Sequence, residues 1–160
     1  MYQNLTLMQA QMTKSQQAEN LRRKGAQAFW KMRAAGLVRR WWARLTGRDT
    51  QSADLNQVAA QASVTNRQDI GRQEVALQDI LGSEGRSGDF DAGFHPVTTH
   101  IRDRWVGIYV ARQQGVVLPP VSLVKVGEGY FIRDGNHRVS VASFLGQNHI
   151  DAEVIVWETT

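Results

Sequence analysis

The sequence predicts a small domain of mixed α/β class, preceded by a long, basic, amphipathic N-terminal helix. Residues 75–160 alternate between short apolar runs and turn signals, which is typical of the strands and helices of one domain. Residues 49–74 are rich in Gln, Asn, Ser and Asp, which indicates a polar linker. The formal charge is +9 over residues 1–48 and −5 over residues 49–160, so a basic helical arm precedes an acidic body.

The arm is predicted to form one helix over residues 4–46, with Thr46 and Gly47 as its stop signal. At the helical period its apolar side chains fall within a stripe about 100° wide. The stripe consists of Trp30, Ala34, Leu37, Val38, Trp41 and Leu45. The arm residues expected to contact a partner are Arg22, Arg23, Trp30, Lys31, Arg33, Arg39, Arg40, Trp41 and Arg44.

Three kinds of partner fit such an arm. Its arginines and lysines suit the phosphates of a nucleic acid, on whose bases tryptophans can stack. The same composition suits an anionic membrane surface, in which tryptophans sit at the headgroup level. The apolar stripe also suits a protein assembly, a sister subunit or the acidic body of this chain. The sequence leaves these three alternatives open.

Composition excludes several classes of protein. The chain has no cysteine, which excludes disulfides, thiolate zinc sites and thiol nucleophiles. No run approaches the roughly 18 apolar residues of a transmembrane helix. The N-terminus has no basic segment followed by an apolar one, so no secretion signal is predicted. We expect a cytoplasmic protein, with peripheral attachment to a membrane as the open alternative.

The elements after residue 48 follow from local patterns. Asp54 can cap a short helix that runs to Ala62, and the apolar run 75–81 predicts a strand before a loop with three glycines. A helix that begins after Thr98 or Thr99 and ends at Gly115 is expected to bury Ile101, Trp105, Ile108 and Tyr109. The remaining elements are a strand at 121–126, its hairpin partner at 130–133, a helix at 136–145 and an alternating strand at 150–156.

The segment from Asp134 to Arg138, between the hairpin and the last helix, is the predicted binding site. Gly135 permits a tight turn, and the first turn of a helix offers unpaired N–H groups and a positive dipole end. Arg138 can grip a phosphate through two parallel hydrogen bonds. The residues predicted to bind a phosphate or nucleotide are Asp134, Gly135, Asn136, His137, Arg138 and Ser140, with Arg86 reaching in from the glycine-rich loop. A capped helix whose His and Arg face solvent is the alternative.

Two further groups of polar residues are candidates for chemistry. His137, oriented by Asp134, is a candidate general acid or base, although no catalytic residue is assigned and binding without turnover is favoured. Asp89 and Asp91 flank a phenylalanine and are expected to be solvated turn acids, with coordination of a cation carried by a nucleotide as the alternative. The histidines around residue 96 lack the spacing of metal ligands, so no metal site is predicted.

Several motifs in a fixed order resemble the ParB/sulfiredoxin superfamily. From residue 75 to 158 they are an opening strand, Arg112-Gln113-Gln114-Gly115, Leu118-Pro119-Pro120-Val121, the hairpin, Asp134-Gly135-Asn136-His137-Arg138 and Ile150-Asp151-Ala152-Glu153-Val154. The chain is also similar to a bacterial branch with GSxGR, DFD, RW, LPPV and DGNHRVSVA motifs, here Gly82–Arg86, Asp89–Asp91, Arg104-Trp105, Leu118–Val121 and Asp134–Ala142.

The resemblance implies a nucleotide ligand at the Asp134–Arg138 loop, CTP or another nucleotide with Mg²⁺. Sulfiredoxins place a cysteine before the His-Arg pair, where this chain has Asn136, so their thiol chemistry is excluded. ParB proteins bind CTP through a loop with acidic character and continue into a DNA-binding segment, and this chain matches neither feature. We therefore expect a nucleotide- or phosphate-binding domain tethered by its arm to nucleic acid or a larger protein assembly. The alternatives are an accessory structural subunit without turnover and, third, a phosphotransferase or nuclease.

Overall fold

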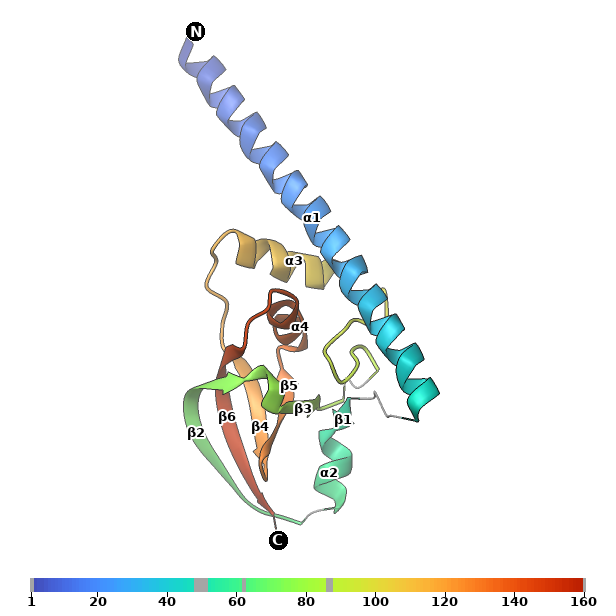
Figure 1. The fold of residues 1–160 in the computed structure, drawn as a ribbon. Helices are drawn as coiled ribbons and strands as arrows, with labels where there is room; N and C mark the ends of the chain where they lie inside the picture. The colour runs from blue at the N-terminus through green and yellow to red at the C-terminus, as the bar shows by residue number, and fades with distance from the viewer. Residues whose placement is uncertain (1, 48–51, 62, 86–87, 160) are drawn as a thin grey trace.

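The computed structural model describes residues 2–47, 52–61, 63–85 and 88–159. It contains one six-stranded mixed sheet and a long N-terminal helix that extends well beyond the body (Figure 1). The strands are β1 (Ala53–Asp54), β2 (Val64–Ala76), β3 (Ile80–Ser83), β4 (Val121–Val126), β5 (Gly129–Asp134) and β6 (His149–Thr159). The helices are α1 (Tyr2–Thr46), α2 (Leu55–Gln61), the 3₁₀ turn η1 (Leu77–Asp79), α3 (Arg102–Gln113) and α4 (Asn136–Phe144).

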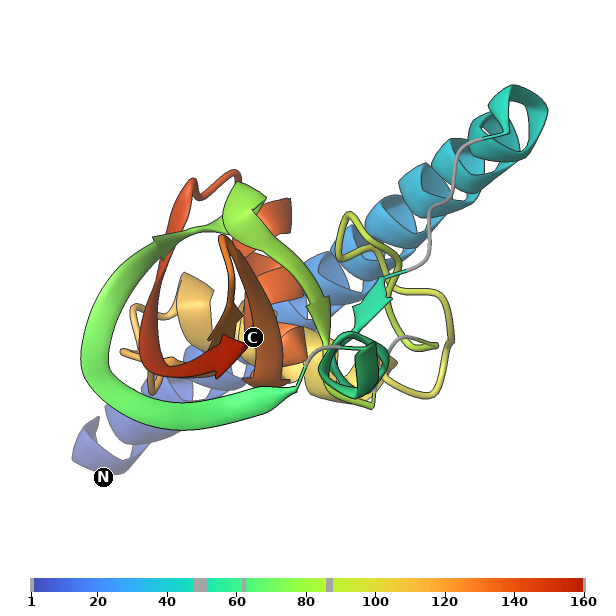
Figure 2. The same cartoon turned by 90° about the horizontal axis from the view of Figure 1, so that it is seen from below.

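The sheet order is β1-β3-β5-β4-β6-β2. The β4–β5 hairpin and the β2–β6 pair are antiparallel, whereas β1–β3, β3–β5 and β4–β6 are parallel. The sheet is strongly curved, and Figure 2 shows β2 passing in a wide arc around β6. This curvature gathers the strands around one end of α4, where β5 leads into that helix.

Both faces of the sheet are covered. Neighbouring residues of the central strands point to opposite faces, as the strand period requires: Leu123 and Ile132 pack under α4, and Val124 and Phe131 pack under Leu55 of α2. A third apolar cluster joins the helical layers to each other and consists of Ala28, Phe29, Met32, Phe90, Ile101, Trp105 and Val141. The order of layers is therefore α2, sheet, α4, and then α3 with α1.

Most elements expected from local signals are present. The long N-terminal helix is confirmed and ends at Thr46, and Gly47 has the positive φ of 67° that suits a helix stop. The Asp54 carboxylate accepts a hydrogen bond from the N–H of Asn56 at 2.9 Å, which caps α2. Of the inward face expected for α3, Trp105 and Ile101, which immediately precedes the helix, are buried, and Ile108 and Tyr109 are half-buried.

The segment expected to be a polar linker is built into the sheet instead. Residues 64–76 form β2, which pairs with β6 from Val64 opposite Thr159 to Ala76 opposite His149. Most β2 side chains are exposed on this edge strand, although Val75 is buried in the core and Ile70 packs partly against it. Most of the strand is held by main-chain hydrogen bonds to β6. Because such pairing does not require apolar side chains, the sequence of β2 shows no apolar alternation. The strand expected at 75–81 is accordingly divided among β2, η1 and β3.

The apolar stripe, for which the body of this chain was one possible partner, is exposed rather than buried against the body. Trp30, Leu37, Trp41 and Leu45 are exposed, with Trp41 retaining 59% of its accessible surface. The buried residues lie on the opposite side of the helix. They are Gly25, Ala28, Phe29, Met32, Gly36 and Ala43, and we call them the inward face.

The inward face packs because its small residues allow close approach. A Cβ at Gly36 would lie 2.6 Å from the Cβ of His95, and one at Gly25 would lie 3.0 Å from Cγ1 of Val106. Phe29 fills the space between these two contacts and meets the ring of Trp105 edge-on at 5.7 Å. The arm is thus part of the folded unit over its second half.

Candidate functional site

Gly135 makes the turn from β5 into α4. Its φ of 107° lies in the region that side chains avoid, and a Cβ there would lie 2.6 Å from Cγ1 of Val121. Only a glycine therefore fits at this one-residue connection between the end of β5 and the start of α4. The turn presents the first N–H groups of α4 next to the end of the sheet.

A small hollow of about 50 Å³ lies at this N-terminus of α4, and we call it the α4 hollow. It is lined by Arg104, Ile108, Arg133, Asp134, Gly135, Asn136, His137 and Arg138. Arginines from three elements border it, Arg104 from α3, Arg133 from β5 and Arg138 from α4, against one carboxylate in the lining, Asp134. Reasoning from sequence missed Arg104 and Arg133, because only the packing of α3 and β5 brings them here.

Arg138 is held by internal hydrogen bonds. Its Nη1 donates to the carbonyl oxygens of Pro119 and Pro120 at 2.7 and 2.8 Å, and its Nη2 donates to Asp134 at 2.6 Å. The side chain is only 15% exposed. Arg138 therefore ties the Pro-Pro segment to the start of α4, and it borders the hollow as a positioning residue.

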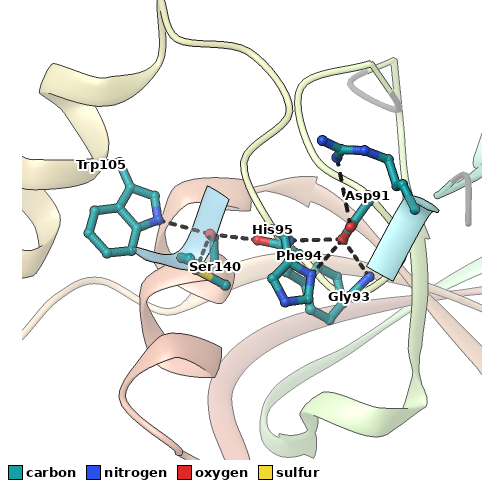
Figure 3. A network of polar contacts seen from close by, with 8 residues as sticks. Asp91, Gly93, Phe94, His95, Trp105 and Ser140 are labelled. Atoms are coloured by element: carbon teal, nitrogen blue, oxygen red, sulfur yellow. Dashed lines mark hydrogen bonds and ion pairs between the residues drawn. The ribbon is translucent and has the colours of Figure 1, made fainter. Parts of the chain in front are cut away.

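Ser140 is buried one turn into α4, where it joins a network of polar contacts (Figure 3). Its hydroxyl donates to the carbonyl oxygen of Phe94 at 2.7 Å and accepts from Nε1 of Trp105 at 2.8 Å. Its Oγ also lies 3.7 Å from Sδ of Met32. With no exposed surface and its hydroxyl engaged, Ser140 joins α4 to α3, and the structure does not bring it to the predicted ligand.

His137 and Asn136 are buried at the first turn of α4. The His137 ring meets the ring of Phe90 edge-on at 5.4 Å. Asp134, expected to orient His137, accepts a hydrogen bond from Arg138. A general acid or base role for His137 stays a prediction, and Arg86 falls outside the described residues.

A buried carboxylate in the 89–97 loop, that of Asp91, was not expected. The Asp91 side chain is only 2% exposed, whereas the sequence suggested a solvated turn acid. Its Oδ1 accepts from the N–H groups of Gly93 and His95 and lies 2.9 Å from Nδ1 of His95 (Figure 3). Its Oδ2 faces Nη1 of Arg40 in α1 at 3.9 Å. An Asp two residues before a Gly is a known turn signal, and it could have indicated this geometry.

The charge of Asp91 is stabilised where it lies. Burial by itself raises the pKa of the Asp91 carboxyl. Burial is outweighed by hydrogen bonds from the His95 ring and from the N–H groups of His95 and Gly93, together with the charge of His95. The pKa of the Asp91 carboxyl therefore lies below its ordinary value. Asp91 is therefore an ionised group that links the loop to Arg40 of the arm.

The arm residues divide into two sets. Arg33 donates from Nε to the carbonyl oxygen of Val97 at 3.3 Å, and Arg40 faces Asp91, so these two help to dock α1 on the body. The others are exposed: Arg22, Arg23, Trp30, Lys31, Arg39, Trp41 and Arg44.

Among the described helices, none has a stretch long and apolar enough to span a bilayer. Within the same residues, no group of three or more His, Asp or Glu side chains is placed to hold a metal ion.

Comparisons with known proteins give one structural neighbour to report. No family model and no curated protein matches the sequence. The crystal structure of sulfiredoxin from Arabidopsis thaliana matches with a TM-score of 0.38 and 19% identity, over 52% of this chain and 82% of that chain. A likeness at this level carries no argument about the α4 hollow or an activity. The ParB/sulfiredoxin relationship and its bacterial branch remain a resemblance of motifs.

Proposed function

We propose that this chain binds a phosphate group, as part of a nucleotide or a related ligand, at the α4 hollow. The supporting observation is that arginines from α3, β5 and α4 meet at the positive end of a nine-residue helix, against one lining carboxylate. Helix N-termini bind anions through their N–H groups and dipole, and arginine adds directed donors. The basic arm tethers this binding domain to a partner.

The individual arginines have different roles in the proposed site. Arg104 and Arg133 are exposed, so their guanidinium groups are accessible to a ligand. Arg133 has one acidic neighbour, Glu84, with its Nε 3.7 Å from the carboxylate, a distance typical of a weak surface pair. Arg138 fixes Asp134 and the Pro-Pro segment, and so keeps the mouth of the hollow in shape.

The size of the hollow limits what it holds. The hollow is small, at about 50 Å³, and the phosphate group is the part of a nucleotide that it suits. Arg138 also borders a larger groove of about 460 Å³, whose polar lining includes Glu74, Arg112 and His149. The remainder of a nucleotide would lie outside the hollow, and this groove is the adjacent space of sufficient volume.

Thermal unfolding of the full chain with phosphate, CTP, ATP, GTP or ADP, with and without Mg²⁺, tests the proposal. A ligand at about 100 times its dissociation constant adds roughly 2.7 kcal/mol to the free energy of unfolding, which raises the melting temperature. We expect such a shift in the wild type, its loss in Arg104→Ala, and its retention in Arg102→Ala. Arg102 is the matched control because it is an exposed arginine on the same helix that does not line the hollow.

The outcome that contradicts the proposal is equally specific. A folded protein that shows no shift with any of these ligands has no phosphate site. Equal shifts in wild type and Arg104→Ala would place the ligand elsewhere. Arg138→Ala is unsuitable as the main test, because it removes three internal hydrogen bonds together with a charge.

A second candidate is an accessory structural subunit that keeps the fold without a ligand. The favouring observation is that two side chains predicted to grip phosphate, Arg138 and Ser140, make internal hydrogen bonds. This candidate predicts no ligand-induced shift and a normally folded Arg104→Ala variant. The same titration therefore distinguishes the two.

A further inference from the structure

The side of α1 that faces away from the body is apolar along four turns. We call it the outward face, and it consists of Trp30, Ala34, Leu37, Val38, Trp41 and Leu45 with Trp42 at its margin. Their large side chains are all exposed, from 45% for Trp30 to 64% for Leu45. A contiguous apolar surface of this kind is rare on a soluble protein unless something covers it.

The body cannot cover the outward face, because the body already occupies the opposite side of the helix. Phe29 packs against Trp105 of α3, Met32 lies next to Ser140 of α4, and Gly36 lies against the 89–97 loop. Figure 1 shows the last turns of α1 projecting past the body. Any occupant of the outward face is therefore a separate partner.

The charges that border the outward face are all positive. No Asp or Glu occurs from residue 20 to residue 48. At the helical period Arg33 and Arg44 lie along one margin and Lys31 along the other. The Arg33 guanidinium also lies over the Trp30 ring, 5.6 Å from its centre. The face thus has an apolar centre and cationic edges.

We propose that the outward face of α1 lies on the surface of an anionic lipid bilayer. Tryptophan, leucine and valine enter the region between headgroups and acyl chains, and arginine and lysine at the margins meet lipid phosphates. The helix lies on the membrane and does not cross it, in keeping with the lack of an apolar span among the described helices. The proposal is independent of the α4 hollow.

Other occupants fit the same surface less well. A nucleic acid would bring its phosphates against the apolar centre of the face, around Ala34 and Trp41, where no cation lies. A second copy of α1 would bring two cationic margins together without acidic partners. A bilayer surface offers an apolar layer under a plane of negative charge, which matches the apolar centre and cationic edges of the outward face.

Vesicle binding by the full chain tests the proposal with a matched pair of variants, Ala34→Glu and Ala35→Glu. Both alanines are exposed on α1, but Ala34 lies at the centre of the outward face and Ala35 outside the stripe. We expect the wild type to co-sediment with phosphatidylcholine vesicles that contain phosphatidylglycerol, and much less with phosphatidylcholine alone. Ala35→Glu should weaken binding about fivefold through charge alone, and Ala34→Glu several-fold more.

Tryptophan fluorescence gives an independent measurement. Brominated lipids should quench the wild-type emission through Trp30, Trp41 and Trp42, whereas Trp105 is buried in the body. Equal binding losses in the two variants, no binding to anionic vesicles, or binding to duplex DNA without vesicle binding would overturn the proposal. Unchanged melting temperatures of both variants ensure that the comparison concerns the surface and not folding.

Discussion

The two faces of α1 differ in a way that reverses the usual expectation. The outward face has the larger apolar side chains, Trp, Leu and Val, and yet it is exposed. The inward face is built largely from glycine and alanine around Phe29 and Met32, and it is buried. Small residues permit the close contacts at Gly25 and Gly36, and interiors require such complementary shape. Which face packs is therefore decided by fit to the body rather than by hydrophobicity alone.

Truncating one apolar residue on each face of α1 tests whether only the inward face contributes to stability. Phe29→Ala should lower the free energy of unfolding by about 3–5 kcal/mol, because a fully buried ring that contacts Trp105 is replaced by a cavity. Leu37→Ala, on the exposed outward face, should change it by less than about 0.5 kcal/mol. Urea denaturation followed by circular dichroism measures both. Similar losses in the two variants would show that the faces are not distinct.

A smaller effect is expected behind the inward face, where Ser140 holds α3 and the 89–97 loop to α4. Ser140→Ala should lower the free energy of unfolding by about 1–3 kcal/mol, because Nε1 of Trp105 and the carbonyl of Phe94 lose a buried partner. Ser143→Ala is the matched control, since Ser143 is half-buried on the same helix. The same denaturation experiment compares them. A neutral Ser140→Ala would mean that the hydroxyl contributes no net stability.

The parts of the fold that were predicted correctly depend on local chemistry. The bounds of β4, the turn at Gly135 and the burial of Trp105 in α3 follow from side-chain period and glycine positions. In the last strand, Ala152 and Val154 are buried and Asp151 and Glu153 are exposed, as their alternation indicated. Each of these features is determined by neighbours close in the sequence.

The parts that were missed depend on contacts between distant segments. The polar strand β2 is specified by pairing with β6, about ninety positions away in the case of Val64 and Thr159. Which side of α1 is buried depends on the shape of α3 and of the 89–97 loop. The candidate site shows the same division: the Asp134–Arg138 loop was predicted from its own residues, but Arg104 joins it only through the packing of α3.

A still smaller change in the free energy of unfolding is expected at the edge of the inward face, where Arg40 faces Asp91. Asp91→Asn should lower the free energy of unfolding by about 1 kcal/mol at pH 7, because charge-assisted hydrogen bonds from His95 and Gly93 become neutral ones. Asp103→Asn, at an exposed carboxylate of α3, is the control and should have little effect. Urea denaturation at several pH values measures both variants.

The pH dependence of this effect has a definite sign. The pKa of Asp91 in the folded protein lies below its ordinary value of 3.8, so the unfolded chain binds more protons in that range. The stability that Asp91 contributes is therefore complete above about pH 3.8 and is lost as the pH falls through the folded-state pKa. The difference between wild type and Asp91→Asn should shrink as the pH falls below the ordinary pKa of the Asp91 carboxyl. A difference that grows as the pH falls below about 3.8 would show that Asp91 is held protonated, and Arg40 would then not attach α1 to the body through charge.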